Sequence, residues 1–180
     1  MKRVTRTVAV AVEVVAVTGA FGFGLAAPLG AARTPRVARA NCQPTQLRVA
    51  VARPQGTAGT IYYPIVFANR GVACWICGVP GIQPVVGAKR HPLGPPATNE
   101  SIGKMPARHY LRHGAAVSVG YGVAESGNYP AATCRARNAS GVLVTLAPFI
   151  RPTYLALRIS VCTRFSSTHT QLLVAGRTGA

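Results

Sequence analysis

Two cysteines separated by two residues are the first place where this chain could do chemistry. Cys74 and Cys77 flank Trp75 and Ile76, and a Cys-x-x-Cys pair exchanges disulfides when one thiol is activated at a helix N-terminus. The surroundings favour another interpretation, because no strand-helix-strand pattern encloses the pair and Gly78-Val79-Pro80-Gly81 continues as a turn. We therefore expect structural cysteines packed with Trp75, and thiol-disulfide redox chemistry is the less favoured alternative.

The same two thiols do not complete a zinc site. A structural zinc ion needs four ligands, whereas Cys74 and Cys77 together with one of the histidines would supply three, and both thiols would have to stay reduced. The candidate histidines are His91, His109 and His113. The sequence predicts no metal and no cofactor.

Acid-base and nucleophilic catalysis lack their usual residues. The chain contains no aspartate, and after residue 40 its acidic residues are Glu100 and Glu125, both in loop-like segments. Hydrolysis by paired carboxylates needs the two groups a few ångströms apart. No Gly-x-Ser-x-Gly elbow and no Gly-x-x-x-x-Gly-Lys loop occurs, and His109, His113 and His169 lie in polar stretches. The sequence thus predicts a protein that is not an enzyme.

Charge is the strongest physical property of the sequence. The 180 residues contain 20 Lys and Arg against three acidic residues, a formal net charge of +17. Such an excess attracts anionic surfaces over about 8 Å in physiological salt, so the predicted partner is an anionic cell-surface component or a protein. A nucleotide-composition bias towards arginine codons is the competing explanation. No motif specific for nucleic acid is present.

Five arginines in the C-terminal third are the candidate anion-contact residues. They lie close in sequence to Tyr154 and Phe165, as in a surface that binds a phosphate backbone. A solvated strand face is the alternative interpretation. The five are Arg135, Arg137, Arg151, Arg158 and Arg164.

The first 40 residues have the pattern of an export signal. A basic start precedes an apolar run at 8–27, and Ala38-Arg39-Ala40 is a small-residue cleavage site. Cleavage nearer the end of the run is one alternative. An uncleaved anchor, which would be the chain's one membrane contact, is another, and Glu13 within the run disfavours it. We expect a signal and processing region at 1–40, a single domain at 41–180, and a secreted or cell-envelope location.

Behind this region the hydrophobic period is two, which is typical of strands. Segments 47–51, 117–123 and 155–161 alternate apolar residues with polar or small ones, so each is predicted to bury one face. Further strands are predicted at 61–67, 142–147 and 172–175, with Gly, Pro and Asn turns between the segments. Seven or eight short strands favour an antiparallel β-sandwich over a barrel.

Two local predictions accompany this fold. Pro64 lies inside a predicted strand but cannot donate to a ladder, so a bulge or an unpaired stretch is expected there. The polar, Pro-rich stretch from Lys89 to Arg112 is predicted to be the most mobile region, with Ile102 and Met105 as its only apolar anchors.

All five cysteines follow residue 40. An exported chain oxidises most of its thiols, so we expect two disulfides and one remaining thiol. The sequence does not define which cysteines pair.

A series of short motifs runs through the domain in a characteristic order. Cys42 is followed by Leu47-Arg48-Val49 and by Tyr63-Pro64-Ile65-Val66-Phe67-Ala68-Asn69, and Cys74 by Gly78-Val79-Pro80-Gly81. Cys134 precedes the run at 142–148 and Cys162 precedes the last strand. This order resembles an uncharacterised family found in exported proteins and lipoproteins of high-GC Gram-positive bacteria, domain of unknown function 4232.

The resemblance implies an all-β, immunoglobulin-like antiparallel sandwich of about seven to eight strands, stapled by disulfides and without enzymatic activity. It carries over Cys42, Cys74, Cys134 and Cys162 as the disulfide candidates. It makes Cys77 the candidate free thiol, because the family usually has another residue there. The strong positive charge departs from the acidic or neutral relatives and indicates an anionic partner.

Overall fold

A computed structural model describes residues 40–179, and all structural statements below concern this part of the chain. The predicted signal and processing region at 1–40 therefore lies outside the described residues, apart from Ala40. Between residues 40 and 179 no helix has the length and apolar character needed to cross a membrane. The helical elements there are η1 (Pro44–Gln46), η2 (Ser126–Asn128) and α1 (Ala131–Cys134).

The larger of two main sheets has seven strands. Its spatial order is β1 (Leu47–Val51), β3 (Thr60–Asn69), β9 (Ala116–Ala124), β12 (Thr168–Thr170) and β7 (Thr98–Asn99). In addition, β2 (Gln55–Thr57) pairs with β3, and β13 (Val174–Ala175) pairs with β9. The pairings are antiparallel except that between β12 and β7.

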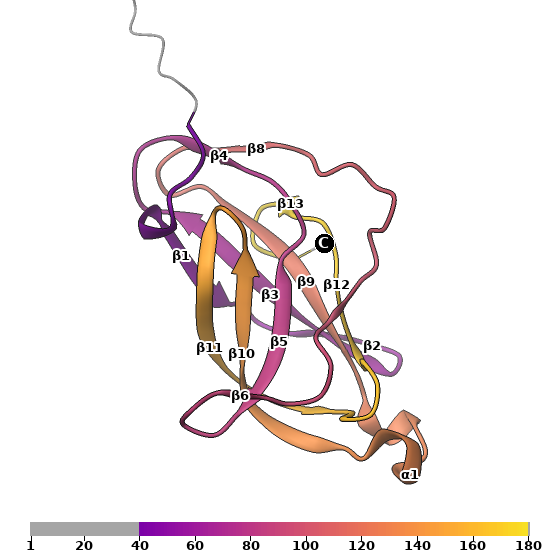
Figure 1. The fold of residues 1–180 in the computed structure, drawn as a ribbon. Helices are drawn as coiled ribbons and strands as arrows, with labels where there is room; N and C mark the ends of the chain where they lie inside the picture. Colours follow the sequence, from indigo (N-terminus) through magenta and orange to yellow (C-terminus); the bar gives the residue numbers. More distant parts are fainter. Residues whose placement is uncertain (1–39, 180) are drawn as a thin grey trace, which may run out of the picture. The chain divides into compact units, whose positions relative to one another are not determined.

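The second main sheet has four strands, and a two-stranded sheet lies apart from both. The four strands are β11 (Ile150–Val161), β10 (Arg137–Leu146), β5 (Gly81–Val86) and β6 (His91–Pro92). The small sheet pairs β4 (Cys74–Ile76) with β8 (His109–Leu111). It lies at one end of the domain, whereas α1 lies at the other (Figure 1).

The predicted all-β sandwich is confirmed. Five of the predicted segments fall in β1, β3, β9, β10 and β11. The described chain holds thirteen strands instead of seven or eight, because several pair over only two or three residues. The immunoglobulin-like strand arrangement stays a prediction.

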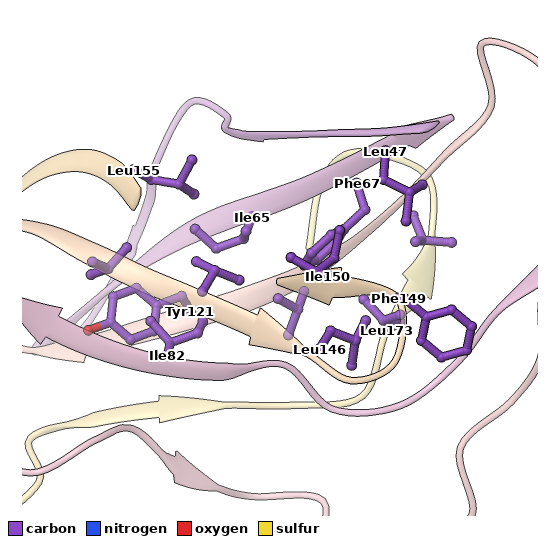
Figure 2. Packing of buried hydrophobic residues seen from close by; sticks show 14 of the residues in the cluster. Leu47, Ile65, Phe67, Ile82, Tyr121, Leu146, Phe149, Ile150, Leu155 and Leu173 are labelled. Atoms are coloured by element: carbon purple, nitrogen blue, oxygen red, sulfur yellow. The ribbon is translucent and has the colours of Figure 1, made fainter. Parts of the chain in front are cut away.

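One core lies between the two main sheets (Figure 2). Ile65 and Phe67 of β3 and Tyr121 of β9 are fully buried and face Ile82 of β5 and Leu146 of β10 across it. Burying a side chain of this size stabilises the folded state by about 1.5 to 3 kcal/mol. The burial of these apolar side chains between the sheets is therefore a main source of the stability of the folded state.

Pro64 is paired regularly with β9, but on its other edge it lies at the break between β1 and β2, so of the two predicted outcomes the unpaired stretch is the one found. β3 pairs with β9 without a register shift, and Pro64 lies opposite Gly120. On the other edge, Ala52 donates its N–H to the Pro64 carbonyl at 2.8 Å, between the end of β1 and the start of β2. Both backbone groups of a paired residue point to the same neighbour in an antiparallel ladder. The missing N–H of Pro64 therefore falls at this break and removes no bond from the β3–β9 ladder.

β9 is buried on both faces, although the alternation predicted one buried face. Ser118, Gly120 and Gly122 alternate with the core residues of β9 and are buried as well. Gly179 donates its N–H to Ser118 Oγ at 2.9 Å, and a Cβ on Gly120 would lie 2.9 Å from the Gly179 carbonyl oxygen. A Cβ on Gly122 would overlap the His169 imidazole. The small residues thus leave room for the C-terminal segment and for one side chain of β12.

The loop between β6 and β8 is not anchored by the residues predicted for it. Ile102 and Met105 are 84% and 90% exposed. Leu93 and Leu111, at the two ends of this stretch, are buried in the core instead. The prediction failed because a lone apolar residue in a loop has no periodicity that reports which way it points.

Candidate functional site

Four of the cysteines form two disulfides. Cys42 is bonded to Cys74 and Cys134 is bonded to Cys162. The first bond joins the segment before η1 to the start of β4, and the second joins the end of α1 to the residue after β11. The bonds therefore fasten opposite ends of the domain (Figure 1).

The Cys-x-x-Cys pair is thus not joined to itself. Cys74 is bonded to Cys42, and Cys77 is a free, half-buried thiol next to the core. β4 contains Cys74, and the segment that follows it is a turn and not a helix. The helix N-terminus that activates a redox cysteine is therefore missing at this place in the described structure.

We expect one reactive thiol per molecule. Four cysteines are held in disulfides, and Cys77 is partly accessible, so a thiol reagent should titrate about one equivalent in the native, unreduced protein. Cys77→Ser should lower this value to zero without exposing another thiol. Two or more equivalents in the native protein, or a reactive thiol that persists in the variant, would contradict the pairing.

The histidines are dispersed. His91 is exposed in β6, His109 Nε2 lies 2.9 Å from the Leu173 carbonyl oxygen, and His113 Nδ1 lies 3.4 Å from that of Gly71. In the described part of the chain no group of three or more His, Cys, Asp or Glu could hold a metal ion.

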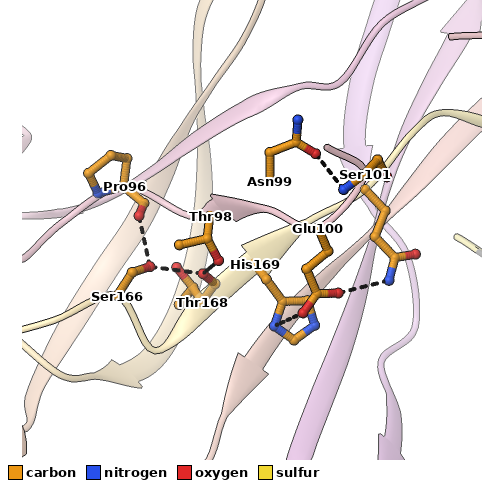
Figure 3. A network of polar contacts seen from close by, with 9 residues as sticks. Pro96, Thr98, Asn99, Glu100, Ser101, Ser166, Thr168 and His169 are labelled. Atoms are coloured by element: carbon orange, nitrogen blue, oxygen red, sulfur yellow. Dashed lines mark hydrogen bonds and ion pairs between the residues drawn. The ribbon is translucent and has the colours of Figure 1, made fainter. Parts of the chain in front are cut away.

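His169 and Glu100 form a cluster at the edge of the larger sheet (Figure 3). His169 Nδ1 lies 3.5 Å from Glu100 Oε1, and Gln171 donates from Nε2 to Glu100 Oε2 at 3.1 Å. The imidazole contacts the Tyr62 ring edge-on at 5.3 Å. These contacts, together with the bonds of Ser166 Oγ to the Pro96 and Thr168 carbonyls, join the loop around β7 to β12. The cluster's evident role is to hold this edge of the sheet together.

The fold strongly changes the acidity of Tyr121. Burial raises the pKa of the Tyr121 phenol far above its ordinary value of about 10, and the Thr168 hydroxyl nearby opposes this in part. The unfolded chain ionises at this tyrosine near pH 10 whereas the folded chain does not. The folded state therefore binds the extra proton, and its stability falls as pH rises above 10.

Alkaline titration should show this difference. We expect the Tyr121 phenol to ionise only when the protein unfolds. Tyr121→Phe should remove that step and make stability above pH 10 less dependent on pH. Formation of one more phenolate in the parent than in Tyr121→Phe before any loss of near-UV circular dichroism would contradict the prediction.

The five predicted anion-contact arginines do not form one surface. Arg135 follows α1, Arg137 begins β10 opposite Val161, and Arg164 follows β11. Arg158 lies towards the same end, where it lines a groove of about 500 Å³ with Asn138 and Ser160. Arg151 lies seven residues further back along β11, roughly 23 Å away at 3.3 Å per residue. It lines a different groove, of about 470 Å³, beside η1.

A third groove brings together arginines that the sequence analysis did not group. Arg48, Arg70 and Arg177 line a groove of about 250 Å³ on the outer face of β1 and β3. They lie in β1, directly after β3 and after β13. In the sequence, only the position of Arg48 on the polar face of segment 47–51 indicates that this arginine lies on the outer face of a sheet. Arg70 and Arg177 lie outside any periodic segment, so their position could not be predicted.

The comparisons with known proteins find one family. A family described as a domain of unknown function (DUF4232) matches residues 42–174. No curated protein and no solved structure matches the chain.

Proposed function

The chain belongs to the DUF4232 family, which covers residues 42–174, and from this premise we propose that it is an exported, non-enzymatic binding domain of the cell envelope. The observation that carries this proposal is the pair of disulfides at opposite ends of the sandwich. Disulfides form and persist in secreted and extracytoplasmic proteins and are rare in the cytosol. An immunoglobulin-like strand arrangement belongs to the same proposal.

The partner class that the charge favours is an anionic component of the cell surface. After residue 40 the chain contains fourteen basic residues and two acidic residues, Glu100 and Glu125. An unbalanced basic surface raises the rate at which anionic partners are met and makes their binding sensitive to salt. Binding of polyanions by charge alone is the second candidate function. It is favoured by the arginines that line each of the three grooves described above.

Cell fractionation tests the location. We expect the protein in the medium or the envelope fraction, with two disulfides on a non-reducing gel and an N-terminus close to residue 41. Recovery from the cytosol with all five thiols reduced would overturn the proposal.

Co-sedimentation with isolated cell envelopes tests the binding. The oxidised protein should sediment with envelopes, and the bound fraction should fall steeply between about 50 and 200 mM salt if anionic groups are the partner. The same protein without envelopes is the control. Absence of envelope binding at the lowest salt would contradict the proposed role.

A further inference from the structure

We propose that the groove between Arg48, Arg70 and Arg177, called here the arginine groove, binds a linear phosphate polymer that carries no bases. The inference deepens the proposed function, on which it rests for the place where the polymer is met, and it names a site and a partner class.

The three arginines come from three separate elements and line one groove. Arg48 of β1 lies opposite Ala68 of β3, and Arg70 follows Ala68 by two residues. Diagonal cross-strand neighbours of this kind are about 7 to 8 Å apart. Arg177 is held by a hydrogen bond from Nη2 to the Gly114 carbonyl at 3.4 Å. The sheet thus fixes the backbone positions of Arg48 and Arg70, and the Arg177 side chain bonds to the turn before β9.

The lining between these arginines is small and apolar. It consists of Ala50, Val51, Ala52, Val66 and Ala68. No carboxylate lines the groove, and no ion pair to an acidic side chain is formed by the three arginines in the described structure. Guanidinium groups bind two oxygens of a phosphate at once. Because the lining between the three arginines consists of small apolar side chains, a flexible chain can lie across the groove without displacing protein side chains.

The acidic residues lie too far away to neutralise this groove. Glu125 bonds through its N–H to Gly59 at the opposite end of β3 from Asn69, about 33 Å along the strand at 3.3 Å per residue. Glu100 contacts His169, which lies opposite Gly122. Gly122 is six residues, or about 20 Å, along β9 from Ala116, which pairs with Ala68, the cross-strand partner of Arg48. Both distances exceed the Debye length of about 8 Å, so the groove keeps its positive potential.

The residues of the groove favour a phosphate chain without bases over the other polyanions. Single-stranded nucleic acids bind through stacking of bases on aromatic side chains, and the lining of this groove contains none. A glycan with one carboxylate in each disaccharide spaces its charges more widely than a phosphate chain does. Three neighbouring arginines therefore meet more anionic groups along a phosphate chain than along such a glycan.

Direct binding measurements with the purified, oxidised protein test the site. The probe is inorganic polyphosphate, and the groove variant is Arg48→Gln/Arg70→Gln/Arg177→Gln. Each lost phosphate contact lowers the slope of log affinity against log salt by about 0.7 for a single-stranded polyanion. Three lost contacts should therefore make the slope less steep by about 2. They should also weaken binding roughly 100-fold near 0.1 M salt.

The matched control removes three charges at the other end of the domain. Arg135→Gln/Arg137→Gln/Arg164→Gln has the same net charge as the groove variant, and we expect it to weaken binding less than 5-fold. Equal losses in both variants would show attraction by net charge and overturn the site. Arg48→Lys/Arg70→Lys/Arg177→Lys should bind with intermediate affinity, because it keeps the charges and loses the two-oxygen contacts. Unchanged circular dichroism and Tm verify that each variant is folded.

Other polyanions test the partner class. Heparin and oligothymidylate of matched charge should bind more weakly than polyphosphate, and tighter binding of either would overturn the class. The outcome is separable from that of the proposed function. Envelope binding that survives in the groove variant rejects the site alone, whereas a reduced cytosolic protein that still binds polyphosphate through the groove rejects the proposed location alone.

Discussion

Replacing Cys42 and Cys74 together by alanine should lower the free energy of unfolding by about 3.5 kcal/mol. The bond between them spans a sequence separation of 32 residues, and closing a loop of this length restricts the unfolded chain by about that amount in the chain-entropy treatment. A domain of this size is stable by only about 5 to 15 kcal/mol. Denaturant unfolding followed by the fluorescence of Trp75, the single tryptophan, measures the loss.

The second disulfide and the free thiol supply the comparisons. Cys134→Ala/Cys162→Ala opens a loop with a separation of 28 residues, so a loss of similar size is expected. Loss of both bonds should leave little of the total stability. Cys77→Ser, which breaks no bond, should change stability by less than about 1 kcal/mol. A loss below about 1 kcal/mol in either double variant would show that the bond does not constrain the unfolded chain.

Gly141→Ala should destabilise the domain by about 3 kcal/mol, at the upper end of the range for overpacking. A Cβ at this position would lie 2.5 Å from the Leu155 carbonyl oxygen and against the Tyr154 ring. The carbonyl belongs to the paired strand. The ring is fixed across Gly141 by a 2.9 Å hydrogen bond from its hydroxyl to the Ser140 carbonyl, with Arg90 on its face. Relief would therefore require β10 and β11 to separate.

Thermal unfolding measures this effect, and a second glycine controls it. At about 2 to 4 °C per kcal/mol for a chain of this length, the Tm of Gly141→Ala should fall by roughly 6 to 12 °C. Gly56 also lies in a strand, but a Cβ there would meet nothing within 4 Å, so Gly56→Ala should stay within about 0.5 kcal/mol of the parent. Equal Tm values for the two variants would contradict the close approach at Gly141.

Three of the five strands that the sequence predicts correctly have a burial pattern that follows the pleat. β1, β10 and β11 alternate because one face packs on the core and the other faces solvent. β5 escaped prediction because Gly81 ends a turn-like run and Pro84 interrupts its apolar residues. β4 and β8 have three residues each, too few for a period to emerge. Their pairing is set by tertiary contacts.

The buried outer face of β9 shows a second limit of periodicity. Ser118 and Gly120 have the small side chains of an open strand face, and the same composition suits a face on which backbone packs closely. The alternation indicates that these residues lie on the opposite face of β9 from the valines between them. It does not indicate that this face is buried by Gly179, which is about sixty residues later in the chain.

The candidate site depends on contacts of the same long-range kind. Cys42 reaches Cys74 because its N–H bonds to the Trp75 carbonyl and aligns the two segments. Arg177 reaches the arginine groove because the C-terminal segment crosses the outer face of β9. Residue type alone identified an excess of basic charge. The sheet registers then decide which arginines share a surface, and no short-range pattern encodes those registers.

The hydrogen bond from the Trp75 N–H to the Ala40 carbonyl, at 3.0 Å, would give the predicted signal cleavage, if it takes place, a structural consequence. A cut directly after Ala40 would take away this acceptor, whereas a cut further upstream would leave it in place. A strand edge that loses its acceptor is a template for pairing with another chain. If the predicted signal is removed, the choice of scissile bond would thereby decide whether the Trp75 N–H at this edge of β4 has an acceptor, while the bond from the Cys42 N–H to the Trp75 carbonyl stays in place.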